Sequence, residues 1–136
     1  MKILVSACLL GTNCKYNGGN NYSEKVARYI KGHEIVPVCP EVLAGLGIPR
    51  TPVEIVNGEV KDRFGNSVDT QLRRAVAEEV EKLDHIDCAI LQSRSPTCGV
   101  NEIYDGNFSG TRMKGSGIFA QALIDAGVRV IDVEDL

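Results

Sequence analysis

Three of the five cysteines in this sequence follow short apolar runs: Cys8 and Cys39 come soon after theirs, and Cys98 lies in the loop after the run that ends near Leu91. Such runs predict buried strands, and in an open α/β sheet ligands bind beyond the carboxyl ends of the strands. We therefore expect these three thiols, far apart along the chain, to meet at one edge of a sheet. Cys14 lies six residues beyond Cys8 and is close enough to join them. Cys88 lies inside an apolar run and is predicted to be a small buried hydrophobic residue.

A group of thiols in a reducing compartment usually serves a metal or a reaction rather than disulfides. Three thiolates suggest an iron–sulfur cluster in which one iron has no protein ligand, and we expect oxygen to remove such a cluster readily from purified protein. Four thiolates would also suit structural zinc, but zinc ligands usually come in close C-x-x-C pairs, which this sequence lacks. The spacing favours the cluster. A zinc site and an iron–sulfur module without catalysis stay open as alternatives.

Glu41 and Ser95 are the two candidate catalytic residues. Glu41 follows Cys39 by two residues on a turn stiffened by Pro40, where it could serve as a general acid or base. The alternative is an ordinary carboxylate in the first turn of a helix. Ser95, three residues before Cys98, could donate a hydrogen bond to bound sulfur or substrate, or it could stabilise a turn.

Four cations are candidates for an anion site: Arg50, Arg94, Arg112 and Lys114. The last two belong to a glycine-rich loop over residues 106–117 that ends at a predicted helix start, where backbone amides favour phosphate. Solvated surface charges are the alternative.

The segment from Cys8 to Lys15 resembles the phosphate loop of low-molecular-weight tyrosine phosphatases, in which a nucleophilic cysteine and an arginine surround phosphate. Here the loop has one residue too many before the cation, and Lys15 replaces the arginine whose planar fork binds phosphate through two hydrogen bonds. A cysteine-dependent hydrolase of this kind is therefore the weaker alternative.

Apolar periodicity predicts the elements that must position these residues. Strands are expected at 3–5, 34–38, 88–91 and 128–133, and helices at 22–31, after Asp69 and after Gly117. The first helix is expected to turn Tyr22, Val26, Tyr29 and Ile30 inward.

The pair Asn57-Gly58 lies between two alternating segments and predicts a β-hairpin near 53–61, because it tolerates the positive φ angles of a type I′ turn. With the alternation of strands and helices, this predicts an α/β fold in a single domain over residues 1–136. We expect a mainly parallel open sheet of the Rossmann or flavodoxin type, with helices on both faces and the hairpin inserted.

Composition excludes several classes of protein. Hydrophobic content of 43% and charged content of 24% are typical of a globular chain, and a net charge of −3 favours small-molecule partners over tRNA, which needs an extended basic face. No run approaches the ~18 apolar residues of a membrane span. The segment Val5-Ser6-Ala7-Cys8 has the form of a lipid-attachment box, but the apolar stretch before it is shorter than the ~7–15 residues of an export signal. We expect a cytoplasmic protein.

The same residues carry a resemblance to a known family, the thiouracil desulfidase (TudS-like) family, along nearly the whole chain. The matching segments are Ser6-Ala7-Cys8-Leu9-Leu10-Gly11, Lys15-Tyr16-Asn17-Gly18-Gly19, Val36-Pro37-Val38-Cys39-Pro40-Glu41-Val42, Pro49-Arg50, Ser95-Pro96-Thr97-Cys98-Gly99, Ile103-Tyr104-Asp105-Gly106 and Phe108-Ser109-Gly110.

The resemblance implies a [4Fe–4S] cluster bound by Cys8, Cys39 and Cys98 with its fourth iron open. It also implies non-redox removal of sulfur from thiolated uracil compounds, such as 2-thiouracil, 4-thiouridine or 4-thio-UMP, to give the oxo form and sulfide. Glu41, and less directly Ser95, would be the catalytic residues. Glu41 would protonate a ring nitrogen or direct a water onto the carbon that carries the sulfur.

Two departures from the family pattern concern the substrate side. Lys15-Tyr16-Asn17 stands where the family often has Arg-Tyr-Asp, so position 17 lacks a carboxylate. Gln92 stands where a lysine is common, which removes a cation that would face the substrate.

Overall fold

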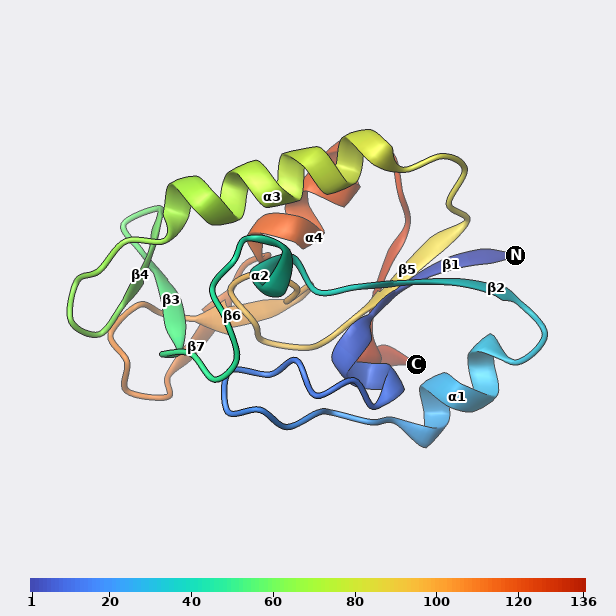
Figure 1. Ribbon diagram of the computed structural model, residues 1–136, viewed down its shortest axis with the longest axis horizontal. Coiled ribbons are helices and arrows are strands. Elements are labelled where there is room, and N and C mark those ends of the chain that lie inside the picture. Colours follow the sequence, from blue (N-terminus) through green and yellow to red (C-terminus); the bar gives the residue numbers. More distant parts are fainter.

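Four parallel strands form the centre of the fold in a computed structural model that describes residues 1–136. In spatial order they are β2 (Glu34–Val38), β1 (Lys2–Ser6), β5 (Cys88–Leu91) and β8 (Val130–Asp132) (Figure 1). The central strands are buried and the edge strand β2 is partly exposed, as expected when an apolar run sits between two layers. This confirms the predicted α/β fold with a mainly parallel open sheet.

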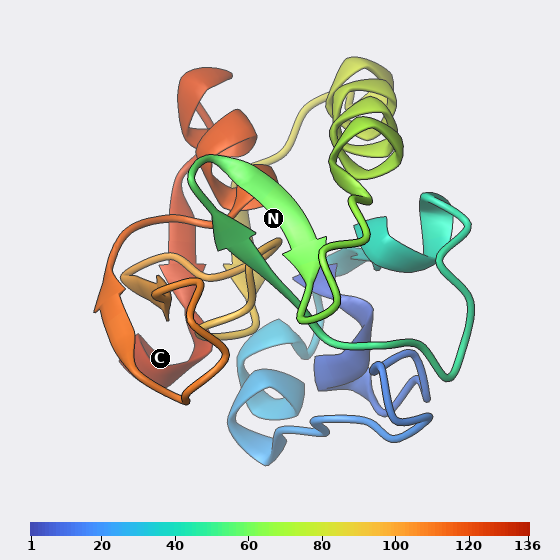
Figure 2. The same ribbon diagram turned by 90° about the vertical axis from the view of Figure 1, so that its left-hand side faces the viewer.

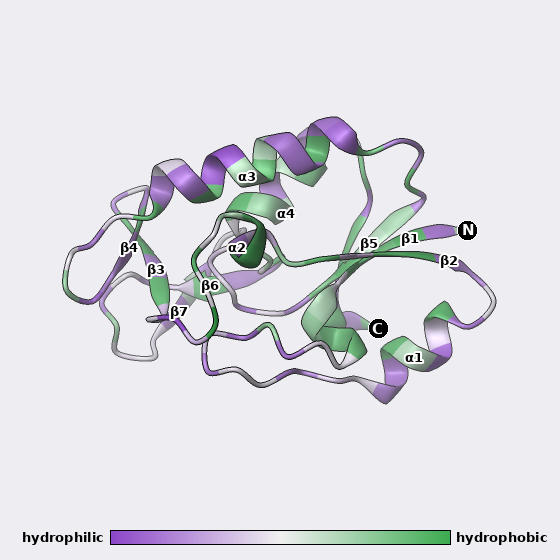
Figure 3. Cartoon of the chain, viewed as in Figure 1, coloured by the Kyte–Doolittle hydropathy of each residue, from purple (hydrophilic) through white to green (hydrophobic).

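Helices cover both faces of the sheet. On one face lie α3 (Asp69–Lys82) and α4 (Ile118–Asp125), and on the other lie α1 (Glu24–Ile30) and a 3₁₀ turn at Ala7–Leu10 (Figure 1). Hydropathy follows this layering, because the central strands are hydrophobic along most of their length whereas α3 alternates hydrophilic and hydrophobic residues (Figure 3).

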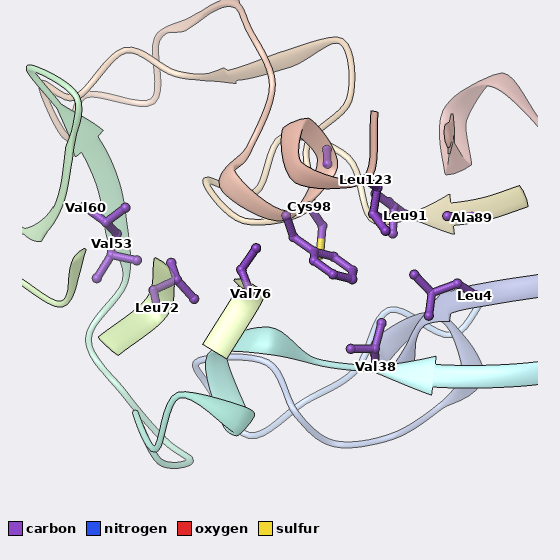
Figure 4. Close-up of a cluster of buried hydrophobic side chains, with 12 residues drawn as sticks. Leu4, Val38, Val53, Val60, Leu72, Val76, Ala89, Leu91, Cys98 and Leu123 are labelled. Atoms are coloured by element: carbon purple, nitrogen blue, oxygen red, sulfur yellow. The ribbon is translucent and has the colours of Figure 1, made fainter. Parts of the chain in front are cut away.

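The core is divided by the sheet into two clusters. Leu4 and Leu91 point to the α3–α4 face and join the larger cluster, which also contains Phe119 and Cys98 (Figure 4). Ile3 and Val5 of β1 and Cys88 and Ile90 of β5 belong to the smaller cluster on the α1 face. Successive side chains of a strand point to opposite faces, so one apolar run supplies both clusters.

Helix α1 is shorter than predicted and buries less. It begins at Glu24, where Ser23 Oγ accepts a hydrogen bond from the backbone N–H of Val26. Tyr22 lies before the helix and is 57% exposed, and Tyr29 is 37% exposed, so of the predicted inward residues only Val26 is fully buried. Val26 and Ile30 both face the smaller core cluster as predicted, with Ile30 partly buried. The inward positions predicted for Tyr22 and Tyr29 were wrong, because Tyr22 precedes the helix and Tyr29 lies on its exposed side.

Two antiparallel hairpins lie at one end of the molecule (Figure 2). The hairpin of β3 (Val53–Val56) and β4 (Glu59–Asp62) turns at Asn57-Gly58, where both φ angles are positive, which confirms the predicted hairpin. The hairpin of β6 (Glu102–Tyr104) and β7 (Arg112–Lys114) was not predicted, since part of it falls in the segment expected to be a loop. Strands β3 and β6 contact each other, so the two hairpins form one wall.

Two short elements complete the chain: helix α2 (Pro40–Leu43), directly after β2, and a 3₁₀ turn at Val133–Asp135. None of the helices combines the length and the apolar content needed to cross a membrane.

Candidate active site

A cavity of about 530 Å³ lies at the carboxyl ends of β1, β2 and β5 and reaches both hairpins. Cys8, Cys14, Cys39 and Cys98 all line it, whereas Cys88 is buried in the smaller core cluster. The structure therefore brings together the thiols that the sequence placed at one edge of the sheet, with Cys14 among them. Their role as ligands stays a prediction.

Cys8 and Cys39 are positioned by the turns that end their strands. Cys8 lies in the 3₁₀ turn directly after β1, and Cys39 is the N-cap residue of α2. Asn21 Nδ2 donates a hydrogen bond to Cys8 Sγ at 3.5 Å, and Cys39 Sγ lies 3.9 Å from the carbonyl oxygen of Cys14. Each thiol thus leaves a strand end at the same edge.

Cys98 lies in a tight loop that Ser95 stabilises from within. Ser95 Oγ accepts hydrogen bonds from the backbone N–H groups of Thr97 and Cys98, at 3.0 and 3.1 Å. This is the turn role named as the alternative for Ser95. Because Ser95 also lines the cavity and its hydroxyl hydrogen is not used in these bonds, it can still donate to a ligand.

The N-terminus of α4 holds the Cys98 loop rather than an anion. The backbone N–H groups of Gly117, Ile118 and Phe119 donate to carbonyl oxygens of residues 96–99, at 2.7 to 2.9 Å. A Cβ at position 117 would lie 2.5 Å from the carbonyl carbon and oxygen of Thr97, so glycine is required for this close approach. The predicted phosphate site at this helix start was therefore wrong, because the loop already occupies its amides.

The four candidate cations separate into two pairs. Arg50 and Arg94 line the cavity, whereas Arg112 and Lys114 lie on the exposed strand β7, where Arg112 pairs with Glu102. The prediction of one anion site lined by all four is wrong.

Burial weakens the acidity of the cavity thiols. It raises the pKa of Cys8 and Cys98, and with the neighbouring Cys39 it raises the pKa of Cys14 to about 12. A hydrogen bond from Ser6 to Cys98 opposes the shift in the pKa of that thiol only in part. Several thiolates in one cavity would repel one another, so the cysteines stay protonated as thiols unless a positively charged group binds there.

The arrangement of the thiols does not suit one metal ion. No three histidine, cysteine, aspartate or glutamate side chains are arranged to hold a single ion. The thiols instead come from separate segments around a shared cavity. Cysteine thiolates are the ligands of iron–sulfur groups, and a group with several irons spans more space than one ion does. The chemistry of the donor set, which consists of thiols, therefore fits an iron–sulfur cluster.

Glu41 is fixed beside the thiols by two donors. Its Oε1 accepts a hydrogen bond and ion pair from Arg50 Nε at 3.0 Å, and its Oε2 accepts from Thr97 Oγ1 at 2.8 Å. Both charged side chains are largely buried, with 16% of Glu41 and 8% of Arg50 exposed. Arg50 also donates to the carbonyl oxygen of Cys14 at 2.8 Å, which ties the carboxylate to the thiol loops.

Among the polar residues of the cavity that sequence reasoning missed, Thr97 and Glu54 make the most specific contacts. Thr97 stands between Ser95 and Cys98, and its position in that segment was the only signal for it. Glu54 lies on β3 with 9% of its surface exposed and lines the cavity. Its strand reads as one side of a solvated hairpin, so no local pattern indicates that it is buried.

Comparison with known proteins agrees with this geometry. Residues 3–135 match the profile of the 2-thiouracil desulfurase family. The chain belongs to this family. A curated relative, the uncharacterized protein YbbK of Bacillus subtilis (strain 168), is 37% identical over an alignment of 148 positions. The alignment covers 98% of this chain and 97% of the relative.

The desulfurase-family fold is shared with a solved structure. The [4Fe-4S]-dependent thiouracil desulfidase TudS matches with a TM-score of 0.92 and 32% sequence identity, over 99% of this chain and 92% of that chain. These findings confirm the family resemblance drawn from the segments around Cys8, Cys39 and Cys98.

Proposed function

We propose that this protein removes sulfur from thiolated uracil compounds with the help of a [4Fe–4S] cluster held by Cys8, Cys39 and Cys98. Its family and its similarity to TudS support the reaction class. The observation that carries the proposal is the meeting of these thiols in one cavity with the carboxylate of Glu41. We further propose a reducing cytoplasm as the place of action, because clustered cysteines in such a compartment usually serve a metal or a reaction.

The proposed reaction replaces sulfur by oxygen without a change of oxidation state: the thiocarbonyl compound and water give the carbonyl compound and hydrogen sulfide. When bound, the cluster supplies a Lewis-acidic iron with affinity for sulfur. The protein supplies the groups that place water and protons around the reacting carbon.

Glu41 is proposed as the residue that directs water. Both of its oxygens accept hydrogen bonds, from Arg50 and Thr97, which suits an ionised carboxylate that accepts a proton from water. This geometry favours the role of base over that of acid. Ser95 is proposed to donate its free hydroxyl hydrogen to the departing sulfur or to the ring.

The substrate is proposed to be a small thiolated base, nucleoside or nucleotide. The cavity is lined by Lys15, Arg63 and Arg94 although the chain as a whole is acidic. These cations favour a substrate that carries a negative group, such as the phosphate of 4-thio-UMP, over the bare base. A polynucleotide such as tRNA is not supported by so local a basic lining.

Anaerobic reconstitution with iron and sulfide, followed by a sulfide-release assay on 2-thiouracil, 4-thiouridine and 4-thio-UMP, tests the proposal. We expect sulfide release only from the reconstituted protein, and the highest kcat/KM with 4-thio-UMP. Activity in iron-free protein would instead indicate a cysteine-dependent hydrolase. A reconstituted cluster without sulfide release from any compound would indicate a non-catalytic module.

A further inference from the structure

Glu54 is a buried carboxylate with no cationic partner. Its Oε1 accepts hydrogen bonds from the backbone N–H groups of Gly106 and Phe108, at 3.0 and 3.3 Å, in the tip of the β6–β7 hairpin. None of the ion pairs of the chain includes it. A buried charge without a counter-charge is costly, so its presence at this position calls for a function.

The second oxygen of Glu54 has no hydrogen-bond partner among the side-chain bonds of the protein. Oε2 takes part in none of the side-chain hydrogen bonds, yet no buried side-chain oxygen or nitrogen is left without a partner. Oε2 is therefore at least partly accessible, and the cavity that Glu54 lines is the space available to it. A neutral oxygen would be enough to hold two backbone N–H groups, so the bonds at Oε1 do not by themselves explain the charge.

The wall around Glu54 is closely packed and contributes two aromatic residues to the cavity. A Cβ at Gly106 would lie 2.6 Å from the carbonyl oxygen of Ile55, so the tip of the β6–β7 hairpin packs closely against the backbone of β3. Phe108 has a φ of 54°, a conformation that is uncommon outside glycine, and it lines the cavity together with Tyr104. The carboxylate thus belongs to the hairpin wall that also contributes Tyr104 and Phe108 to the cavity lining.

We propose that Glu54 is a substrate-binding residue whose Oε2 accepts a hydrogen bond from a donor on the thiolated uracil compound. This inference rests on the proposed function and names the group that recognises its substrate. Two donors have this chemistry: a ring N–H and a ribose hydroxyl. An N–H donor would also distinguish uracil-type rings from cytosine-type rings, in which N3 is an acceptor that a carboxylate repels.

The substitution Glu54→Gln separates binding from support of the hairpin. Glutamine keeps an oxygen that can accept from Gly106 and Phe108, but it places an NH₂ donor toward the cavity. With the reconstituted full chain and 4-thiouridine, we expect KM to rise about tenfold or more and kcat to change little, since hydrogen bonds to charged groups are among the stronger ones. Glu59→Gln is the matched control, because Glu59 lies on the same hairpin, is 45% exposed and does not line the cavity.

The choice of substrate identifies the donor. If the ring N–H is bound, wild-type protein discriminates against 4-thiouridine methylated at N3, and Glu54→Gln loses that discrimination. If a ribose hydroxyl is bound, Glu54→Gln raises KM for 4-thiouridine but not for the free base 4-thiouracil. Wild-type KM values in Glu54→Gln for all three compounds would overturn the inference, as would a lower unfolding temperature with unchanged KM.

A binding measurement keeps this test apart from that of the proposed function. If the wild-type protein releases no sulfide from any thiolated compound, the proposed function fails. Calorimetric binding of uridine and uracil, the oxo products, to the reconstituted wild type and Glu54→Gln then decides the role of Glu54. Weaker binding by the variant supports it, and equal binding or none by either protein overturns it.

Discussion

Glu41 is the residue on which the proposed chemistry depends most directly. Its position is set by Arg50 on one oxygen and Thr97 on the other, and Thr97 belongs to the same loop as Cys98. The carboxylate is therefore held near the thiols by side-chain hydrogen bonds, and not only by the backbone of the short helix α2. A general base needs this fixed placement, because small displacements from the reacting atom are costly to rate.

We predict that Glu41→Gln lowers the rate of sulfide release by about 100-fold or more, the usual range for loss of a general base. The amide can still accept from Thr97, but it cannot take a proton from water. Brown cluster absorbance and bound iron should stay close to wild type. Glu102→Gln is the control, because the side chain of Glu102 is 48% exposed, and it should leave the rate unchanged. Turnover by Glu41→Gln equal to that of wild type would exclude the proposed role.

At the scale of elements, the contact between the Cys98 loop and the start of α4 links the core to the site. We predict that Gly117→Ala, whose Cβ would lie 2.5 Å from Thr97, displaces this loop and lowers the free energy of unfolding by about 1–3 kcal/mol. Because Cys98 moves with the loop, the variant should also bind less iron after reconstitution. Thermal unfolding and iron content measure the two effects.

Gly127→Ala is the control for this prediction. Gly127 has a φ of 83° with nothing within 4 Å of the added Cβ, so the substitution strains the backbone far from the cavity. It should lower the unfolding temperature and still bind a full complement of iron. Equal iron content in both glycine variants would show that the helix start does not position Cys98.

The elements that could be predicted from the sequence are those with a local pattern. The strands around β1 and β5 follow from apolar runs, and the first hairpin follows from Asn57-Gly58. Strands β6 and β7 have three residues each, and β7 is exposed throughout, so neither shows the alternation that identifies a strand. No local sequence pattern indicates that the backbone N–H groups at the start of α4 donate to carbonyl oxygens of residues 96–99.

The site was predictable to the same extent. Strand ends in a parallel sheet meet at one edge, which is enough to expect Cys8, Cys39 and Cys98 together. The pairing of Glu41 with Arg50 and the burial of Glu54 depend on how loops and hairpins fold over that edge, and single-sequence patterns do not encode those contacts.

At the scale of the whole molecule, the cluster should act as a cross-link between segments. A group that binds only the folded chain stabilises it by mass action, about 2.7 kcal/mol at a hundredfold excess over the dissociation constant. We therefore predict that reconstitution raises the unfolding temperature by about 5–10 °C, as followed anaerobically by circular dichroism. Unchanged unfolding temperatures would contradict a cluster held by distant segments.

The cysteine variants refine this prediction. Cys8→Ser, Cys39→Ser and Cys98→Ser should each lose the cluster absorbance together with the gain in unfolding temperature. Cys14→Ser is the matched control, because Cys14 lines the same cavity but is not among the proposed ligands. It should keep both properties.

Cys98 is the last cysteine in the sequence, and its loop is held in place by helix α4, which follows it at residues 118–125. During translation Cys8 and Cys39 leave the ribosome long before this helix can form. The proposed ligand set of Cys8, Cys39 and Cys98 would therefore be complete only after residues 118–125 have folded, so we expect iron and sulfur to be delivered after this helix forms.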